Sequence, residues 1–131
     1  MPTVIDRAVR TLTKLHVPHA VDGDRIRVPP ADATAFEVRL QIVDDRAFLV
    51  ECEGWRHDFD RPEDAYDCFE YVLSDNSRLK VVYRGDWPEV WQIEKREFGM
   101  WVPAHPVTRR SWAFWKPRRI EYRQNNIFNA T

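Results

Sequence analysis

The sequence contains little glycine and no long apolar run. Its four glycines stand apart from one another, so no glycine-rich loop is present to hold a phosphate. This excludes a P-loop nucleotide site and a Rossmann dinucleotide site. No apolar stretch approaches the roughly 20 residues that a helix needs to cross a bilayer. We therefore expect no membrane partner.

Cysteine is also scarce. The two thiols, Cys52 and Cys68, belong to no Cys-X-X-Cys pair. The N-terminus leads directly into a helical pattern, without the apolar segment of a secretory signal. We expect a cytoplasmic protein in which both thiols are reduced, buried and inert.

Metal-binding and catalytic motifs are missing as well. The four histidines show no zinc-ligand spacing, and no serine lies in a nucleophile-elbow pattern. An acidic cluster flanks Trp55 but lacks the glycine and the spacing of a calcium-binding EF-hand loop. Its members are Glu51, Glu53, Asp58 and Asp60. We interpret this cluster as a solvated face, and we predict no metal and no cofactor.

The chain is rich in aromatic residues, and its charge is unevenly distributed. Aromatics make up 13% of the chain and include six tryptophans, which favours an aromatic core in a β-rich domain. Residues 101–131 carry six Lys and Arg against one acid, whereas residues 44–75 carry eleven acids against three Arg. These two regions could neutralise each other within the molecule. The length of 131 residues predicts a single domain, 1–131.

Two segments have the pattern of amphipathic helices. Residues 4–16 follow Thr3, which forms a capping-box pattern with Asp6. Residues 61–73 follow Asp60, the expected N-cap. The second helix presents one apolar face, formed by Ala65, Cys68, Phe69, Val72 and Leu73.

Most other segments alternate as β-strands, and a hairpin over residues 78–102 is the clearest of them. It turns at residues 85–88 and buries one face, which carries Leu79, Val81, Tyr83, Trp91 and Ile93. Met100–Val102 is expected to pair back as a third strand. We expect Pro103 to end this strand and a loop to run on to residue 110.

Further strands are expected on both sides of this hairpin. Before it we expect a hairpin over 20–28 and strands over 36–43, 47–52 and 55–59; after it, strands over 111–115 and 118–124. In the last strand, Ile120 and Tyr122 are expected to face inward.

The register between the strands over 36–43 and 47–52 can also be predicted. Their apolar residues share one face only if paired residue numbers sum to an even number. A three-residue loop at 44–46 satisfies this condition, with Ile42 opposite Phe48, Leu40 opposite Val50 and Arg39 opposite Glu51.

All connections between consecutive strands are too short for a parallel crossover. The sequence therefore predicts an α+β fold with a single antiparallel sheet of about six to eight strands and both helices packed on one face. Residues 125–131 are expected to form a loose tail, unless Ile127 and Phe128 dock.

The strongest functional pattern is at the C-terminal end, where residues 109–123 interleave six cations with four aromatics. Trp and Arg are favoured at binding interfaces. We predict a non-enzymatic binding module whose partner is a protein or a small ligand. Its working surface is expected to carry Trp87, Trp112, Trp115, Arg118, Arg119 and Arg123. An uncovered sheet edge would also allow a homodimer.

Two alternatives stay open. The first is single-stranded nucleic-acid binding by residues 109–123, because cations follow phosphates and aromatic rings stack on bases. The second is a small enzyme with a Trp-lined pocket. In that enzyme, His57 or His105 would act with Glu53 or Asp58 as an acid–base pair.

Overall fold

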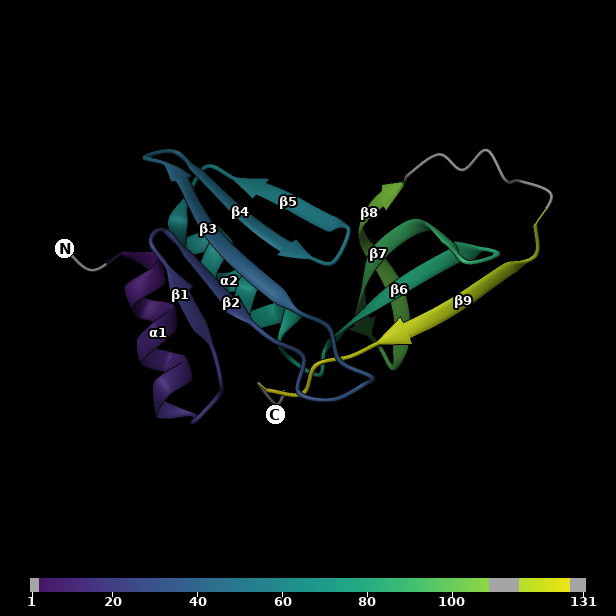
Figure 1. Ribbon diagram of the computed structural model, residues 1–131, viewed down its shortest axis with the longest axis horizontal. Coiled ribbons are helices and arrows are strands. Elements are labelled where there is room, and N and C mark those ends of the chain that lie inside the picture. The colour runs from purple at the N-terminus through teal and green to yellow at the C-terminus, as the bar shows by residue number, and fades with distance from the viewer. Residues whose placement is uncertain (1–2, 109–115, 128–131) are drawn as a thin grey trace.

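The computed structural model describes residues 3–108 and 116–127 (Figure 1). Within them the chain forms two helices and nine strands: α1 (Val4–Lys14), β1 (Ala20–Asp22), β2 (Arg25–Val28), β3 (Val38–Asp44), β4 (Ala47–Cys52), β5 (Trp55–Phe59), α2 (Pro62–Val72), β6 (Ser77–Arg84), β7 (Trp87–Glu97), β8 (Met100–Thr108) and β9 (Arg118–Arg123). The predicted α+β class is confirmed. The predicted strand over 111–115 lies outside the described residues.

The prediction of a single sheet is wrong, because the strands form two antiparallel sheets. One has the order β1-β2-β3-β4-β5 and the other the order β8-β7-β6-β9. A short connection requires antiparallel pairing only between two strands that are consecutive in the chain. Helix α2 interrupts that series between β5 and β6, and β6 pairs instead with β7 and β9. Figure 1 shows the two sheets next to each other.

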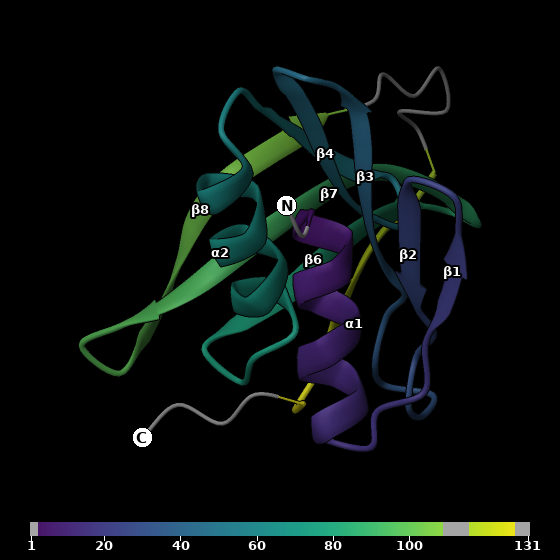
Figure 2. The same ribbon diagram turned by 90° about the vertical axis from the view of Figure 1, so that its left-hand side faces the viewer.

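Both helices cover the same face of the five-stranded sheet (Figure 2). Helix α1 contacts β2 and β3, and α2 contacts β3, β4 and β5. Every second side chain of the strands points toward the helices, and these apolar side chains form the core. They include Ile26, Val38, Leu40, Val50 and Cys52. The same cluster of buried residues continues into the four-stranded sheet through Leu79, Val81 and Ile93.

The predicted register of β3 and β4 is confirmed at three pairs: Leu40 opposite Val50, Ile42 opposite Phe48 and Arg39 opposite Glu51. The connection differs from the prediction. The register shifts between Ile42 and Asp44, and Asp44 pairs with Ala47. A bulge at Val43 therefore supplies the extra residue, and it keeps the apolar faces of both strands together.

The central hairpin buries the predicted face, with Leu79 opposite Ile93 and Val81 opposite Trp91. Strand β8 was predicted to end at Pro103, but it continues to Thr108. Among the described strands it pairs with β7 alone and lies at the edge of its sheet. Proline is tolerated at such an edge because no neighbour requires its missing N–H group.

The helix boundaries differ slightly from the prediction. Thr3 and Asp6 form the expected capping box, but α1 ends at Lys14. Helix α2 begins one residue later than expected, with Arg61 rather than Asp60 at the N-cap and no side-chain cap. The hydroxyl groups of Thr11 and Tyr66 lie 2.9 Å apart and join the two helices.

The segment after β9 is docked at residues 125–127, where the sequence left a choice between a loose tail and docking through Ile127 and Phe128. Phe128 lies outside the described residues. The Asn125 side chain is buried; its Nδ2 donates to the Val72 carbonyl at 3.3 Å, and its Oδ1 accepts from the Phe36 N–H group at 3.4 Å. The Ile127 N–H group donates to the Leu73 carbonyl at 3.0 Å. The bonds to the Val72 and Leu73 carbonyls satisfy backbone groups at the C-terminal end of α2.

Candidate functional site

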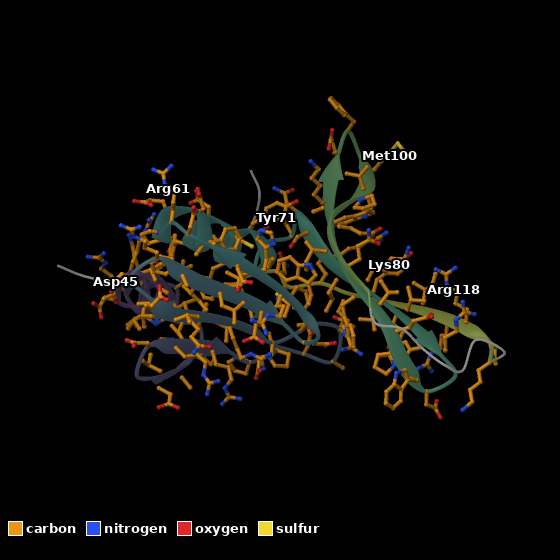
Figure 3. The ribbon with its side chains drawn as sticks, turned by 90° about the horizontal axis from the view of Figure 1, so that it is seen from above. Asp45, Arg61, Tyr71, Lys80, Met100 and Arg118 are labelled. Carbon is orange, nitrogen blue, oxygen red and sulfur yellow. The ribbon has the colours of Figure 1, made fainter. Side chains whose placement is uncertain are left out.

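The four-stranded sheet has one face toward the core and one face away from it, and Val82 and Glu94 on the second face are also buried. On β6, Leu79 and Val81 are buried in the core, and alternation places Arg78, Lys80 and Arg84 on the opposite side. We call this second side the outer face. Figure 3 shows Lys80 and Arg118 on the side of the sheet away from Tyr71 of α2.

The strand ladders order the side chains of the outer face in rows. One row holds Trp87, Arg84 and Arg118, and the next holds Val90, Val82 and Ile120. The following rows are Gln92, Lys80 and Tyr122, and then Glu94 with Arg78. Arg96 and Trp101 form a further pair on β7 and β8.

Cations and aromatic rings alternate at one end of this face. The Arg78 guanidinium lies 3.8 Å from the centre of the Tyr122 ring and 4.5 Å from that of Trp101. Arg96 lies 4.8 Å from the Trp101 ring centre. The Arg78 Nε also donates to Glu94 at 2.7 Å, and the Glu94 side chain is buried. Arg78 is therefore held by cation–π contacts and by a charge-assisted hydrogen bond.

Three cations on the outer face have no acidic partner among the residues that the structure describes. Within the described part of the chain, Lys80, Arg96 and Arg118 form no ion pair with a carboxylate. By contrast, Arg84 is paired with Glu89 at 2.9 Å. The described outer face therefore carries uncompensated positive charge.

Large apolar side chains are exposed beside these cations. The exposed fractions are 55% for Trp87, 48% for Tyr122 and 42% for Ile120. Ile120 and Tyr122 were predicted to face inward, and that prediction is wrong. The other side of β9 carries Arg119, Glu121 and Arg123, which lie next to polar groups rather than the apolar core.

Arg123 joins the two sheets. Its guanidinium is paired with Glu53 in the turn between β4 and β5, and it donates to the Tyr83 hydroxyl at 3.0 Å. It also lies 3.3 Å from Glu121. Burial is the largest single effect and disfavours the charged form of Arg123, but Glu53, Tyr83 and Glu121 together outweigh it and raise the pKa of Arg123. Arg123 is therefore already engaged within the chain.

The six predicted binding residues do not share one surface. Trp87 and Arg118 lie in one row of the outer face, whereas Arg119 and Arg123 lie on the opposite side of β9. The Arg119 guanidinium lies 4.6 Å from the Tyr83 ring centre. Trp112 and Trp115 lie outside the described residues. The prediction missed Trp101, Tyr122 and Arg96, which alternation along β7, β8 and β9 would have revealed once those strands were paired correctly.

The structure shows the partners of both predicted acids, Glu53 and Asp58. Glu53 is paired with Arg123, and Asp58 lies 3.8 Å from Arg56. Asp58 follows His57 directly in β5, so the two side chains lie on opposite faces of the sheet. His57 instead contacts the rings of Trp55 and Phe59. His105 is paired with Ile93 in the ladder between β7 and β8.

The thiols are poor nucleophiles. Burial raises the pKa of Cys52 well above its ordinary value, and burial raises the pKa of Cys68 to about 12. Both are free thiols. Among residues 3–108 and 116–127, no three His, Cys, Asp or Glu side chains gather closely enough to hold a metal ion. No helix in the same ranges has the length and the apolar character needed to cross a membrane.

Comparison of the chain with protein-family models, with curated proteins and with solved structures finds no match.

Proposed function

We propose that this protein is a non-enzymatic interaction module that binds an acidic segment of a protein partner on the outer face of the four-stranded sheet. One observation carries the proposal: cations without a carboxylate partner among the described residues lie next to exposed aromatic and aliphatic side chains on one regular surface. Such a surface complements a segment that carries both carboxylates and apolar side chains.

The composition of the surface fits a protein interface. Trp, Tyr and Arg are the residues most enriched at binding hot spots. Trp87, Tyr122 and Arg118 lie in nearby rows of the sheet, and a sheet holds side chains in fixed positions. The ion pair between Arg78 and Glu94 further fixes one end of this surface before any partner binds.

Single-stranded nucleic acid is the second candidate ligand, and two observations make it the weaker one. The Trp101 ring is already contacted by Arg78 and Arg96, and the Tyr122 ring is contacted by Arg78. Base stacking requires free aromatic faces. The whole chain has a net charge of −1, which does not favour a polyanion at long range.

The test is fluorescence anisotropy with two labelled probes, a short peptide in which Glu alternates with Leu and an oligothymidine. We expect the peptide to bind more tightly than the oligothymidine at moderate salt. The double variant Lys80→Gln/Arg118→Gln should weaken peptide binding about five-fold, because each exposed charge contributes up to about 1 kcal/mol. Tighter binding of the oligothymidine, with a steep loss of affinity in salt, would support the nucleic-acid function instead.

A matched control removes the same amount of charge elsewhere. Arg10 lies on α1 and Arg46 lies in the turn between β3 and β4; both are exposed. The double variant Arg10→Gln/Arg46→Gln should bind the peptide as the unmodified protein does. Equal losses in the two double variants would show that net charge alone attracts the peptide, and would contradict the proposed surface.

A further inference from the structure

A cleft of about 490 Å³ lies where α2 and the edge strand β5 meet β7 and β8. It is separate from the outer face, because its strand residues from the four-stranded sheet, such as Ile93, belong to the core side. Its volume falls within the range of small-molecule sites. Figure 3 shows Tyr71, which lines the cleft, between the two sheets.

The walls of the cleft are mainly apolar. Three aromatic rings contribute to them, those of Trp55 and Phe59 on β5 and of Tyr71 on α2. Val72, Ile93 and Ala104 add aliphatic surface. The Cys68 thiol also lines the cleft, and its pKa of about 12 keeps it neutral near pH 7. A wall of this kind binds the apolar body of a ligand.

Two charged residues line the same cleft, and they differ in their surroundings. The Lys95 Nζ atom lies 3.2 Å from a carboxylate oxygen of Glu97, so its charge is compensated. The Asp67 carboxylate forms no ion pair within the described part of the chain. Taken together, Asp67, Lys95 and Glu97 give the lining and rim of the cleft one net negative charge.

The lining of the cleft therefore favours a cationic ligand. Aromatic faces attract ammonium groups through their ring quadrupoles, and an unpaired carboxylate attracts them by direct charge. We propose that this cleft binds a small organic cation, an amine or alkylated ammonium attached to an aromatic or aliphatic body. The apolar body lies against Trp55, Phe59 and Tyr71, and the cationic group lies near Asp67.

The experiment uses the full chain and two probes of similar shape and opposite charge, 1-naphthylethylamine and 1-naphthylacetate. Binding is followed by the amide chemical shifts of residues around the cleft. We expect the amine to bind and to shift amides of α2 and β8, and we expect the carboxylate to bind more weakly. Equal binding of both probes, or the absence of shifts with the amine, would overturn the proposal.

Substitutions then test the role of the Asp67 charge and the role of the cleft volume. Asp67→Asn should weaken binding of the amine about three-fold, as expected for an exposed ion pair, without weakening binding of the carboxylate. Asp64→Asn removes a carboxylate from the same helix but outside the cleft, and it should leave both affinities unchanged. Ala104→Phe fills the cleft from the edge strand β8 and should abolish binding of the amine. Unchanged amine binding in a folded Asp67→Asn or Ala104→Phe protein would contradict the site.

Discussion

The indole ring of Trp91 lies directly against the backbone at Gly54. A Cβ atom at residue 54 would overlap ring carbons Cδ2 and Cε2 of Trp91 and would lie only 2.6 Å from Cζ2. Gly54 lies in the turn between β4 and β5, and Trp91 lies in the middle of β7. This contact is therefore a point where the two sheets meet, and glycine is needed there for the close approach of the ring.

Gly54→Ala should destabilise the protein by about 2–3 kcal/mol, because a bulky ring in the core would have to move to make room. The measurement is chemical denaturation, with the midpoint compared at equal slope. A smaller side chain at residue 91 should relieve the clash. Gly54→Ala combined with Trp91→Leu should therefore lose less stability than the sum of the two single losses. Strict additivity would show that the two residues do not oppose each other.

Asn125→Ala should cost about 2 kcal/mol in the free energy of unfolding. The substitution leaves the Phe36 N–H group and the Val72 carbonyl without their side-chain partner in a buried place. The neighbouring Asn126 is exposed, so Asn126→Ala should change stability by less than about 0.5 kcal/mol. Equal effects of the two substitutions would contradict the structural role of the Asn125 side chain.

The features that the sequence predicts correctly depend on short stretches of chain. The capping box of Thr3 and Asp6 involves one helical turn, and the pairing of Leu40 with Val50 follows from alternation across one hairpin. The division into two sheets depends instead on contacts such as that of Trp91 with Gly54, far apart in the chain. No local pattern encodes such a contact.

The candidate site shows the same limit. Alternation in β9 correctly separates Tyr122 and Ile120 from Arg123, but it does not say which side faces inward. The inner side of this edge strand meets Glu53 and Tyr83 rather than the apolar core, so it carries Arg119, Glu121 and Arg123 in place of apolar side chains. Asn125 gave no signal at all, because a polar residue after the last strand is typical of an exposed tail.

Acid should weaken the start of α1 through Asp6. The hydrogen bonds from Thr3, first its N–H group and then its hydroxyl, lower the pKa of Asp6 below 3.8. The charged form therefore stabilises the fold above pH 3.8, and this contribution is lost as the pH falls through the lowered pKa. Asp6→Ala should lower the melting temperature at pH 6 and should have a smaller effect at pH 2. An equal effect at both pH values would show that the charge of Asp6 contributes nothing.

Cys68 should react slowly with alkylating reagents, and the rate should depend on pH in a specific way. A thiol of pKa about 12 is ionised to about 0.01% at pH 8, whereas a free cysteine is ionised to roughly a quarter. Because the thiolate is the nucleophile, the rate constant should be about 2,000-fold below that of a free thiol at pH 8. It should rise about ten-fold per pH unit up to pH 10, without the plateau that a free cysteine shows near its pKa of about 8.5. The measurement is iodoacetamide labelling of a Cys52→Ala variant followed by mass spectrometry, with the denatured variant as the control. A plateau below pH 10 in the folded variant would show that burial does not raise the pKa of Cys68.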